Sequence, residues 1–212
     1  MSRGQFITLE GIEGAGKSTA ARFVSAALTA AGYTVLVTRE PGGTPLAERL
    51  RAIVLEPGTE LVTPLTETLL MFAARALHVT HLIRPALARG DWVVCDRFTD
   101  ATRAYQGSAR GVEAALIEQL AQAVHGDLQP DCTLLLDLPV PAGLARARAR
   151  HGAADRFEAE SVRFFEKVRA GYLALARAEP ERVHLIDAAA PMAQVERDIG
   201  AILQSLAARA PA

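Results

Sequence analysis

The sequence predicts a three-layer α/β domain in which helices flank a parallel sheet. Short apolar runs of β-forming residues alternate with longer segments of helical period, and this alternation is typical of such domains. The short runs are apolar at successive positions, as expected for strands buried on both faces. The 212 residues contain no internal repeat and no low-complexity linker, so we expect one domain over 1–212.

Five runs are candidate strands. They are "FITLE" (6–10), "TVLVT" (34–38), "WVVCD" (92–96), "TLLLD" (133–137) and "VHLID" (183–187). Four of the five end in an acidic residue. Ligands of open parallel sheets bind at the carboxyl ends of the strands, so these acids mark the edge where a site is expected.

Helical segments are expected between the strands. They cover about 17–31, 64–89, 112–125, 141–151 and 157–178, and a last helix has apolar residues spaced three and four apart from Met192 to Leu206. Two segments do not fit the alternation of strands and helices: "REPGGTPLAERLR" (39–51) and "RARARHGAADRFE" (146–158). We interpret both as functional loops with the helices that flank them.

Composition favours a cytoplasmic protein without nucleic-acid or membrane partners. The 23 basic and 24 acidic side chains give a net charge of -1, so any positive site must be local. No signal peptide and no apolar run of about 20 residues is evident. Cys95 and Cys132 are expected as buried, reduced thiols, and His78 and His81 as ordinary helix residues, since no third metal ligand is evident.

A phosphate-binding loop follows the first strand. Residues 11–18, "GIEGAGKS", have the pattern G-x-x-x-x-G-K-[ST] with a strand before and a helix after, which predicts the P-loop NTPase fold. The residues expected to bind ATP are Gly11, Ile12, Glu13, Gly14, Ala15, Gly16, Lys17, Ser18 and Thr19. Lys17 suits the β- and γ-phosphates and Ser18 suits Mg²⁺. Glu13 adds an unexpected carboxylate to this anion site.

The remaining motifs favour a kinase for a small acceptor. The chain lacks the N-K-x-D box of GTPases. In "DRFTDATRAYQG" (96–107), Asp96 is placed to hold Mg²⁺ through water and Arg97 to clamp a phosphate, while Tyr105 and Gln106 offer an aromatic face and an amide. Phe72 and Arg75 are three apart and share a helix face, where they could stack and bond a base.

The arginine-rich segment near 146–157 is a candidate lid. With about 3.6 residues per helical turn, Arg146 and Arg150 share a face and Arg148 points away. Arg150 is nearest the loose "HGAAD" loop, from which an arginine could stabilise the transferred phosphoryl group. A solvated basic helix face is the alternative.

Together these motifs resemble the thymidylate kinase family in its bacterial form. The resemblance covers nearly the whole chain and rests on "EGIEGAGKST" (10–19), "TREPGGT" (38–44), "LMFAAR" (70–75), "DRF" with "AYQG" (96–98 and 104–107) and the basic lid. It implies transfer of the γ-phosphate of ATP to dTMP, giving dTDP, with Mg²⁺. It also implies a five-stranded parallel sheet, a mobile lid and a homodimer, for which the apolar 64–89 segment is a candidate surface.

The resemblance also implies roles for individual residues. Substrate-binding roles are implied for Glu13, Arg39, Arg51, Phe72, Arg75, Arg97, Thr102, Tyr105 and Gln106, and catalytic roles for Lys17, Arg97 and Arg150. Phe72 would stack on thymine and Arg75 would bond its edge. Arg39 and Arg97 would hold the dTMP phosphate with Arg51 close by, and Tyr105 would pack against the deoxyribose. Glu13 would accept a hydrogen bond from the 3′-hydroxyl.

Two positions separate this chain from common patterns of the family. A second subfamily has an arginine after the loop acid, where this chain has Gly14, so the catalytic arginine is expected from the lid. Ala101 stands where a serine is usual, and the two alternatives for Thr102 are that it supplies the hydroxyl or that it contacts the base. A kinase for another nucleoside or monophosphate is the alternative, and a nucleotide-binding regulator without turnover is a third hypothesis.

Overall fold

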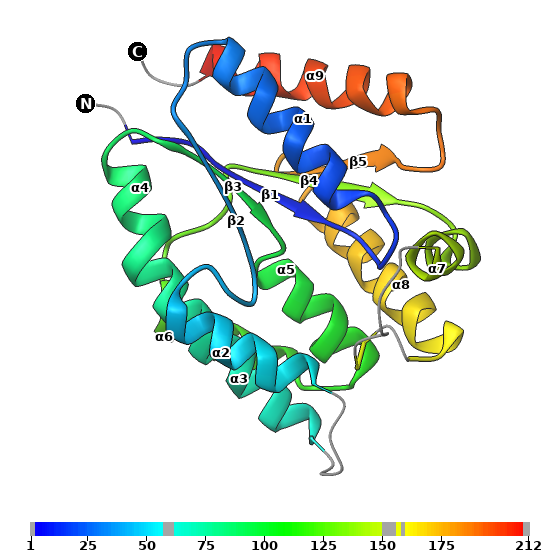
Figure 1. The fold of residues 1–212 in the computed structure, drawn as a ribbon. Helices are drawn as coiled ribbons and strands as arrows, with labels where there is room; N and C mark the ends of the chain where they lie inside the picture. The colour runs from blue at the N-terminus through cyan, green and yellow to red at the C-terminus, as the bar shows by residue number, and fades with distance from the viewer. Residues whose placement is uncertain (1–2, 57–61, 150–155, 158–159, 210–212) are drawn as a thin grey trace.

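A single parallel sheet forms the middle layer of the protein. The computed structural model describes residues 3–56, 62–149, 156–157 and 160–209. The sheet has five strands in the order β2-β3-β1-β4-β5, which confirms the predicted α/β fold (Figure 1). The strands are β1 Phe6–Glu10, β2 Val35–Arg39, β3 Trp92–Asp96, β4 Cys132–Asp137 and β5 Val183–Asp187.

Burial on both faces is confirmed for the inner strands and is wrong for the outer two. Strands β1, β3 and β4 are almost wholly buried. In the edge strands β2 and β5, Val37 and Leu185 are about half exposed, at 49% and 55%. Side chains at the rim of a sheet reach solvent, and the apolar pattern alone does not reveal which strands lie there.

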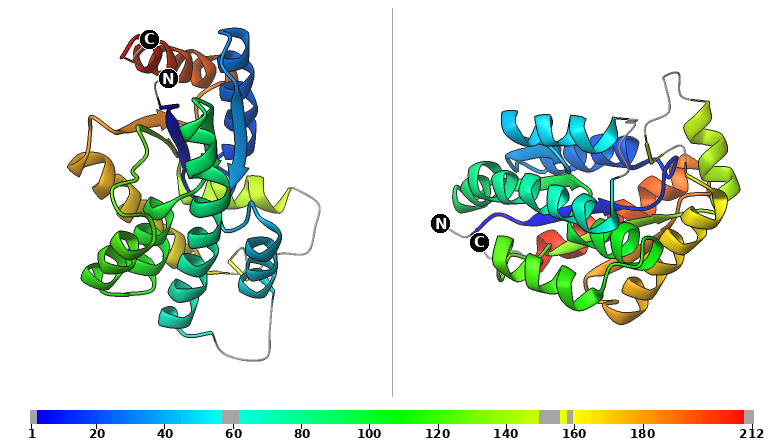
Figure 2. Two further views of the ribbon diagram at one scale, coloured as in Figure 1. Left: turned by 90° about the vertical axis from the view of Figure 1, so that its left-hand side faces the viewer. Right: turned by 90° about the horizontal axis from the view of Figure 1, so that it is seen from below.

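Helices cover both faces of the sheet. Helices α1 (Lys17–Ala30) and α9 (Met192–Arg209) lie on one face, and α4 (Arg84–Ala88), α5 (Thr99–Thr102) and α8 (Val162–Ala178) lie on the other (Figure 1). Helix α2 (Pro45–Leu55) packs on α3 (Pro64–His78), and α3 packs on α6 (Ala114–His125). Helix α7 (Val140–Arg148) lies beside the carboxyl ends of the strands, next to the loop after β1 (Figure 2).

The long helix predicted over 64–89 is interrupted. After α3, residues Val79–Ile83 form a π-helical turn, η1, before α4 begins at Arg84. Pro85 lacks the N–H that an α-helix would use and its ring crowds the carbonyl one turn earlier, which favours the wider turn at this point. A helical period predicts the direction of the segment but not this local change of winding.

Three helical elements, α2, α5 and a π-helical stretch after α5, form where the sequence pattern predicts no helix with defined bounds. Helix α2 begins inside the segment 39–51, where the Thr44 side chain accepts a hydrogen bond from the N–H of Ala47 and Pro45 occupies the first turn. Residues Arg103–Ala109 form a second π-helical stretch, η2, directly after α5. Helix α8 begins at Val162, later than predicted, because Ser161 caps it at the N–H of Phe164.

The main core lies between the sheet and helices α1, α8 and α9. Cys95 and Cys132 are both buried and unpaired, as predicted, and burial raises the pKa of Cys132 to about 12. In the part of the chain that the structure describes, no helix has both the length and the apolar character that a bilayer span requires.

Candidate active site

The phosphate loop joins β1 to α1 and packs closely against α7. Gly14 has a φ of +75°, and a Cβ there would lie 1.9 Å from the carbonyl oxygen of Gly143. Both the left-handed backbone and this close approach exclude a side chain. The loop can therefore pack closely against α7, and the motif predicts that its amide groups and the positive end of α1 bind an anion.

Lys17 is buried at the start of α1. Its Nζ donates to the carbonyl oxygens of Gly11, at 3.1 Å, and Ile12, at 3.0 Å. Burial lowers the pKa of Lys17 and the Arg97 guanidinium adds to this, while the carboxylates of Glu13 and Asp96 act in the opposite direction. The ammonium group is thus held against the loop, at the position predicted for contact with the transferred phosphate.

Arg97 occupies a tight turn after β3. Its φ of +71° is left-handed, a conformation that costs a residue with a side chain about 1–2 kcal/mol. Two hydrogen bonds hold the turn: the N–H of Arg97 donates to the carbonyl of Leu9, and the N–H of Phe98 donates to the buried carboxylate of Glu10 at 2.7 Å. Tyr172 donates to the other oxygen of Glu10.

The Arg97 side chain connects the phosphate loop with a neighbouring pocket. Its Nη2 lies 2.6 Å from Glu13 Oε1 and 3.0 Å from the Tyr105 hydroxyl, and its Nη1 donates to the carbonyl of Gly11 at 3.1 Å. The guanidinium also lies 4.7 Å from the centre of the Tyr105 ring. Burial opposes the charge, but Tyr105 and Glu13 outweigh it and keep the pKa of Arg97 above its usual value.

The pocket beside Arg97 collects most of the residues predicted to bind the acceptor. Its lining includes Arg75, Arg97, Thr102, Tyr105 and Gln106, together with Leu55, Met71, Ala101 and Phe157. The lining comes from five parts of the chain that are distant in sequence. Apolar walls and a few polar groups are typical of a site for a small ligand.

Arg75 is one of the most strongly anchored side chains of this pocket. It is 3% exposed, and its Nε lies 2.7 Å from a carboxylate oxygen of Glu40, which is also buried. Its Nη2 donates to the carbonyl of Phe98 and to the hydroxyl of Thr102, both at 3.1 Å. The Nη1 atom is buried without a hydrogen-bond partner among the described residues, so this donor remains available to a ligand.

Phe72, which is predicted to stack on a base, lies next to Arg75 and packs against α6. Within the described residues it does not line the pocket but packs with Ile117 and Ala121 of α6, and the Arg75 guanidinium lies 4.8 Å from its ring. Met71, one residue earlier and four before Arg75, lines the pocket instead. Residues four apart on a helix face the same way, so Met71 is the neighbour of Arg75 on the pocket side.

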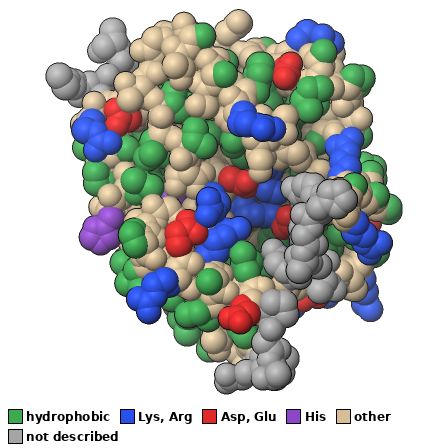
Figure 3. Space-filling view, viewed as in Figure 1, with side chains coloured by type: hydrophobic (Ala, Val, Ile, Leu, Met, Phe, Trp, Pro, Cys, Tyr) green, Lys and Arg blue, Asp and Glu red, His purple; other side chains and the backbone are tan. Residues whose placement is uncertain are grey.

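Arg39 and Arg51 lie near the opening, at the end of β2 and on α2. Arg39 is half exposed and pairs with Glu48 at 2.9 Å, and Arg51 donates to the carbonyl of Pro41 at 2.9 Å. Burial acts to raise the pKa of Glu48, but the hydrogen bond from the N–H of Gly43 and the Arg39 guanidinium together lower this pKa below its usual value. Lys and Arg side chains gather with acidic ones in the hollow at the middle of this face (Figure 3).

A second pocket adjoins the phosphate loop on the side of α9. Its lining includes Gly14, Gly16, Phe23, Arg146 and Met192. Arg146 donates from Nη1 to the carbonyl of Ala188 at 2.8 Å. The loop thus borders this second pocket, and Arg97 connects the loop to the first one.

Comparison with known proteins identifies the family. A sequence model described as thymidylate kinase matches residues 9–199. The thymidylate kinase of Pseudomonas fluorescens (strain SBW25) is 58% identical over 207 residues, 98% of each chain, and that of Pseudomonas syringae pv. syringae (strain B728a) is 57% identical over 203 residues, 96% of each. A crystal structure of thymidylate kinase from Ehrlichia chaffeensis has 32% identity and a TM-score of 0.77, covering 95% of this chain and 99% of that one.

The chain belongs to the thymidylate kinase family. Membership confirms the predicted class of enzyme, an ATP-dependent nucleoside monophosphate kinase, and the predicted P-loop NTPase fold. The predicted catalytic Arg150 lies outside the described residues, and Arg148 is exposed on α7. The roles of individual residues stay predictions, and their positions now give those predictions a geometry.

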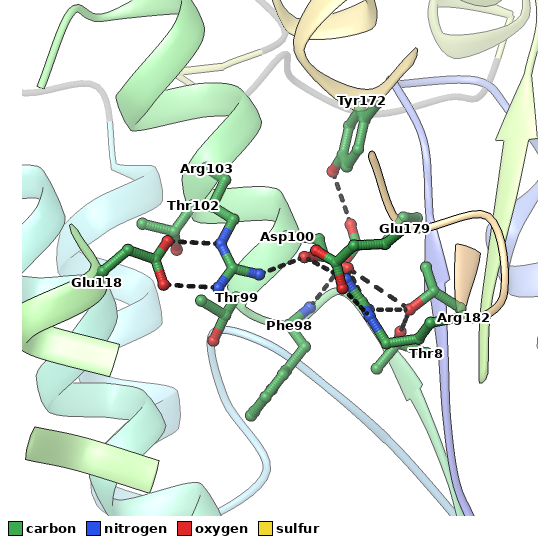
Figure 4. Close-up of polar contacts among 12 residues, drawn as sticks. Thr8, Phe98, Thr99, Asp100, Thr102, Arg103, Glu118, Tyr172, Glu179 and Arg182 are labelled. Carbon is green, nitrogen blue, oxygen red and sulfur yellow. Dashed lines mark hydrogen bonds and ion pairs between the residues drawn. The ribbon is translucent and has the colours of Figure 1, made fainter. Parts of the chain in front are cut away.

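A polar network centred on the buried Asp100 anchors α5 and η2, which carry residues of the thymidylate kinase pocket (Figure 4). Asp100 pairs with Arg182 at 2.7 Å and with Arg103 at 2.8 Å, and Arg103 pairs in turn with Glu118 of α6. Burial acts to raise the pKa of Asp100, but Arg182 and Arg103 outweigh it and lower the pKa. The network fixes α5 and η2, which present Thr102, Tyr105 and Gln106 to the pocket.

Sequence reasoning missed several supporting residues. The motif "TREPGGT" that contains Glu40 indicates no role for this residue, and the sequence predicts His78 to be an ordinary helix residue. His78 is in fact buried, with Nδ1 2.9 Å from Glu40 and Nε2 2.8 Å from the Thr38 hydroxyl. The available signal was the polar side chain of His78 in an otherwise apolar helical stretch, because a polar side chain is buried there only with a partner.

Proposed function

We propose that the chain transfers the γ-phosphate of ATP to dTMP, giving ADP and dTDP. The observation that carries this proposal is the position of Arg97, which contacts both the phosphate loop and the acceptor pocket. Two phosphate groups repel each other, so a cation between the donor and acceptor sites serves transfer directly. The phosphate oxygen of dTMP is already anionic and needs no general base to become a nucleophile.

The pocket suits the polar edge of thymine. Thymine presents the O4 acceptor beside the N3–H donor, and the pocket presents the Arg75 guanidinium beside the Gln106 amide. We assign the Arg75 Nη1 donor to O4 and the Gln106 carbonyl to N3–H. Met71 takes over the stacking contact first assigned to Phe72, and the Thr102 hydroxyl holds Arg75. Tyr105 packs against the deoxyribose, and Glu13 accepts a hydrogen bond from the 3′-hydroxyl.

Cationic side chains make the main contribution to phosphoryl transfer. Arg97, Arg39 and Arg51 hold the acceptor phosphate, and Lys17 neutralises charge on the transferred group together with Arg150. Charge neutralisation and alignment dominate phosphoryl transfer in this class of enzyme. The adenine of ATP binds the pocket that Arg146 lines, next to Gly14 and Phe23.

Magnesium fits the residues near the transferred phosphate. Asp96 Oδ1 is buried without a hydrogen-bond partner among the described residues, and Ser18 is exposed at the start of α1. The described residues contain no group of three or more His, Cys, Asp or Glu side chains that could hold a metal, but Mg²⁺ needs only a few protein oxygens alongside phosphates and water. When bound, Mg²⁺ neutralises phosphate charge, and Ser18 and Asp96 would hold it, Asp96 through water.

A phosphorylation assay across acceptors tests the proposal. ADP release is measured with each nucleoside and nucleoside monophosphate, and dTMP is expected to be preferred by a wide margin. Preference for another acceptor would favour the alternative kinase, and ATP binding without transfer would favour a regulator. Arg97→Ala is expected to abolish most transfer while ATP affinity stays near wild type, and near-normal turnover would refute its role.

We also propose that the protein forms a homodimer. Four apolar side chains of α2 and α3 are about half exposed: Leu46, Ile53, Leu65 and Leu69, at 49%, 56%, 49% and 47%. Exposed apolar side chains on neighbouring helices suit a contact between two copies. Sedimentation of the wild type is expected to give a dimer mass, and Leu69→Lys is expected to shift it toward the monomer.

A further inference from the structure

The carboxylate of Glu67 is completely buried behind the acceptor pocket. It lies in the first turn of α3 with 0% exposure. Its Oε1 accepts from Gln106 Nε2 at 2.7 Å and lies 3.3 Å from Arg110 Nε, and its Oε2 lies 2.6 Å from Arg156 Nη2. Two guanidinium groups and one amide thus surround one carboxylate, which explains how a charge can remain in this apolar position.

The contact with Glu67 determines which way the Gln106 amide faces. A carboxylate between two arginines accepts hydrogen bonds and offers none, so only the NH₂ end of the amide can face it. The carbonyl end of Gln106 accepts no hydrogen bond from the residues that the structure describes, and Gln106 lines the acceptor pocket. The carbonyl oxygen is therefore the part of this side chain left for a ligand.

Arg75 is likewise oriented by hydrogen bonds to its neighbours. Glu40 and Thr102 occupy its Nε and Nη2, so only donors remain for the ligand. The pocket then offers a donor from Arg75 beside an acceptor from Gln106. Thymine matches this pair with O4 and N3–H, whereas cytosine presents an amino group and an unprotonated N3, the reverse pattern.

We propose that Glu67 is a positioning residue that sets the choice of base, by holding the Gln106 amide with its carbonyl toward N3–H of a thymine-type base. The inference rests on the proposed function, since it takes the pocket to be the site of the acceptor base. Glu67 itself does not touch the base. Without its carboxylate, the amide of Gln106 can rotate and offer its NH₂ end, which suits the N3 of a cytosine-type base equally well.

The test compares dTMP with 5-methyl-dCMP, which keeps the methyl group and reverses the hydrogen-bonding edge. The measured quantity is the ratio of their kcat/KM values for wild type and Glu67→Gln. We expect this ratio to fall about tenfold or more, the effect of one well-placed hydrogen bond, with KM for ATP unchanged. Glu160→Gln is the matched control, because Glu160 pairs with Arg110, as Glu67 does, but has no hydrogen bond to Gln106 among the described residues.

A second pair of variants separates positioning from general stability. If Glu67 acts through Gln106, then Gln106→Ala and Glu67→Gln/Gln106→Ala should show the same reduced ratio. Should Glu67→Gln fail to fold, Glu67→Asp keeps the charge beside Arg110 and Arg156 but withdraws the carboxylate from Gln106, and it should also lower the ratio.

Three outcomes are distinguishable. A wild type that does not prefer dTMP contradicts the proposed function. A dTMP-selective wild type whose folded Glu67→Gln or Glu67→Asp variant keeps the full ratio overturns the inference alone. A selective wild type whose ratio falls in these variants and is unaffected by Glu160→Gln supports both.

Discussion

Glu13 Oε1 lies 2.6 Å from Arg97 Nη2, so the carboxylate of the phosphate loop is paired with the arginine that follows β3. The two side chains are only 21% and 15% exposed, and Tyr105 donates to the same carboxylate oxygen. The Glu13 carboxylate is therefore directed at Arg97 and Tyr105 and not at the site expected for the phosphates. It holds the guanidinium at the boundary between the two pockets.

Glu13→Gln is expected to slow transfer without weakening ATP binding. The neutral amide cannot form the ion pair with Arg97 and leaves only a weaker hydrogen bond, and small displacements of a positioned group can reduce rate by about 10²-fold. We expect kcat with dTMP to fall at least about tenfold, less than in Arg97→Ala, with ATP affinity near wild type. Steady-state kinetics and a binding titration measure the two quantities. A kcat equal to wild type would contradict the positioning role.

Met71→Ala and Phe72→Ala are expected to separate binding from stability. Met71 lines the pocket and is only partly buried, so its loss should raise KM for dTMP and leave the melting temperature nearly unchanged. Phe72 is buried against Ile117, so its removal should lower the free energy of unfolding by about 3–5 kcal/mol. Kinetics and thermal unfolding of both variants test this. The reverse result would restore Phe72 as the residue that stacks on the base.

Gly14→Ala is expected to disrupt the phosphate loop. The new Cβ would meet the carbonyl of Gly143, and the left-handed φ adds strain. Gly32 is the matched control, with a φ of +90° and nothing within 4 Å of its Cβ position. Gly32→Ala should cost about 1 kcal/mol for the backbone alone, and Gly14→Ala should cost more and also weaken ATP binding. Equal effects on unfolding would show that the approach of α7 does not constrain the loop.

Glu10 and His125 are expected to affect stability with opposite dependence on pH. Burial, and then Asp100, raise the pKa of Glu10 from 4.5 to about 7. The folded protein thus binds this proton more tightly, and its contribution to the unfolding free energy falls as pH rises from 4.5 to 7. Burial, and then Arg75, lower the pKa of His125 from 6.5 to about 4, so its contribution rises with pH between 4 and 6.5.

Glu10→Gln isolates one of these opposed contributions. Relative to wild type, the unfolding free energy of the variant should increase by about 3 kcal/mol as pH rises from 4.5 to 7, because the titrating carboxyl is gone. Urea unfolding at several pH values measures this difference. Glu118→Gln is the control, since the pKa of Glu118 is lowered and it titrates below this range. Parallel curves for wild type and Glu10→Gln would contradict the expectation.

The sequence by itself determined the sheet, the phosphate loop and the class of enzyme. These features depend on local patterns: apolar runs for β1 to β5, glycines with Lys17 and Ser18 between a strand and a helix, and the Asp96-Arg97 pair at a strand end. Each pattern acts through the geometry of neighbouring residues, so it can be recognised without the rest of the chain.

Only the tertiary structure decided which side chains meet. Glu13 and Arg97 are 84 residues apart, and Glu67 and Gln106 are 39 apart. One step along a helix turns a side chain by about 100°. The packing of α3 against α6 therefore decides whether Met71 or Phe72 lines the pocket. Local sequence sets the period of a helix, but long-range packing sets its rotation, and that rotation decides which residues face the acceptor pocket.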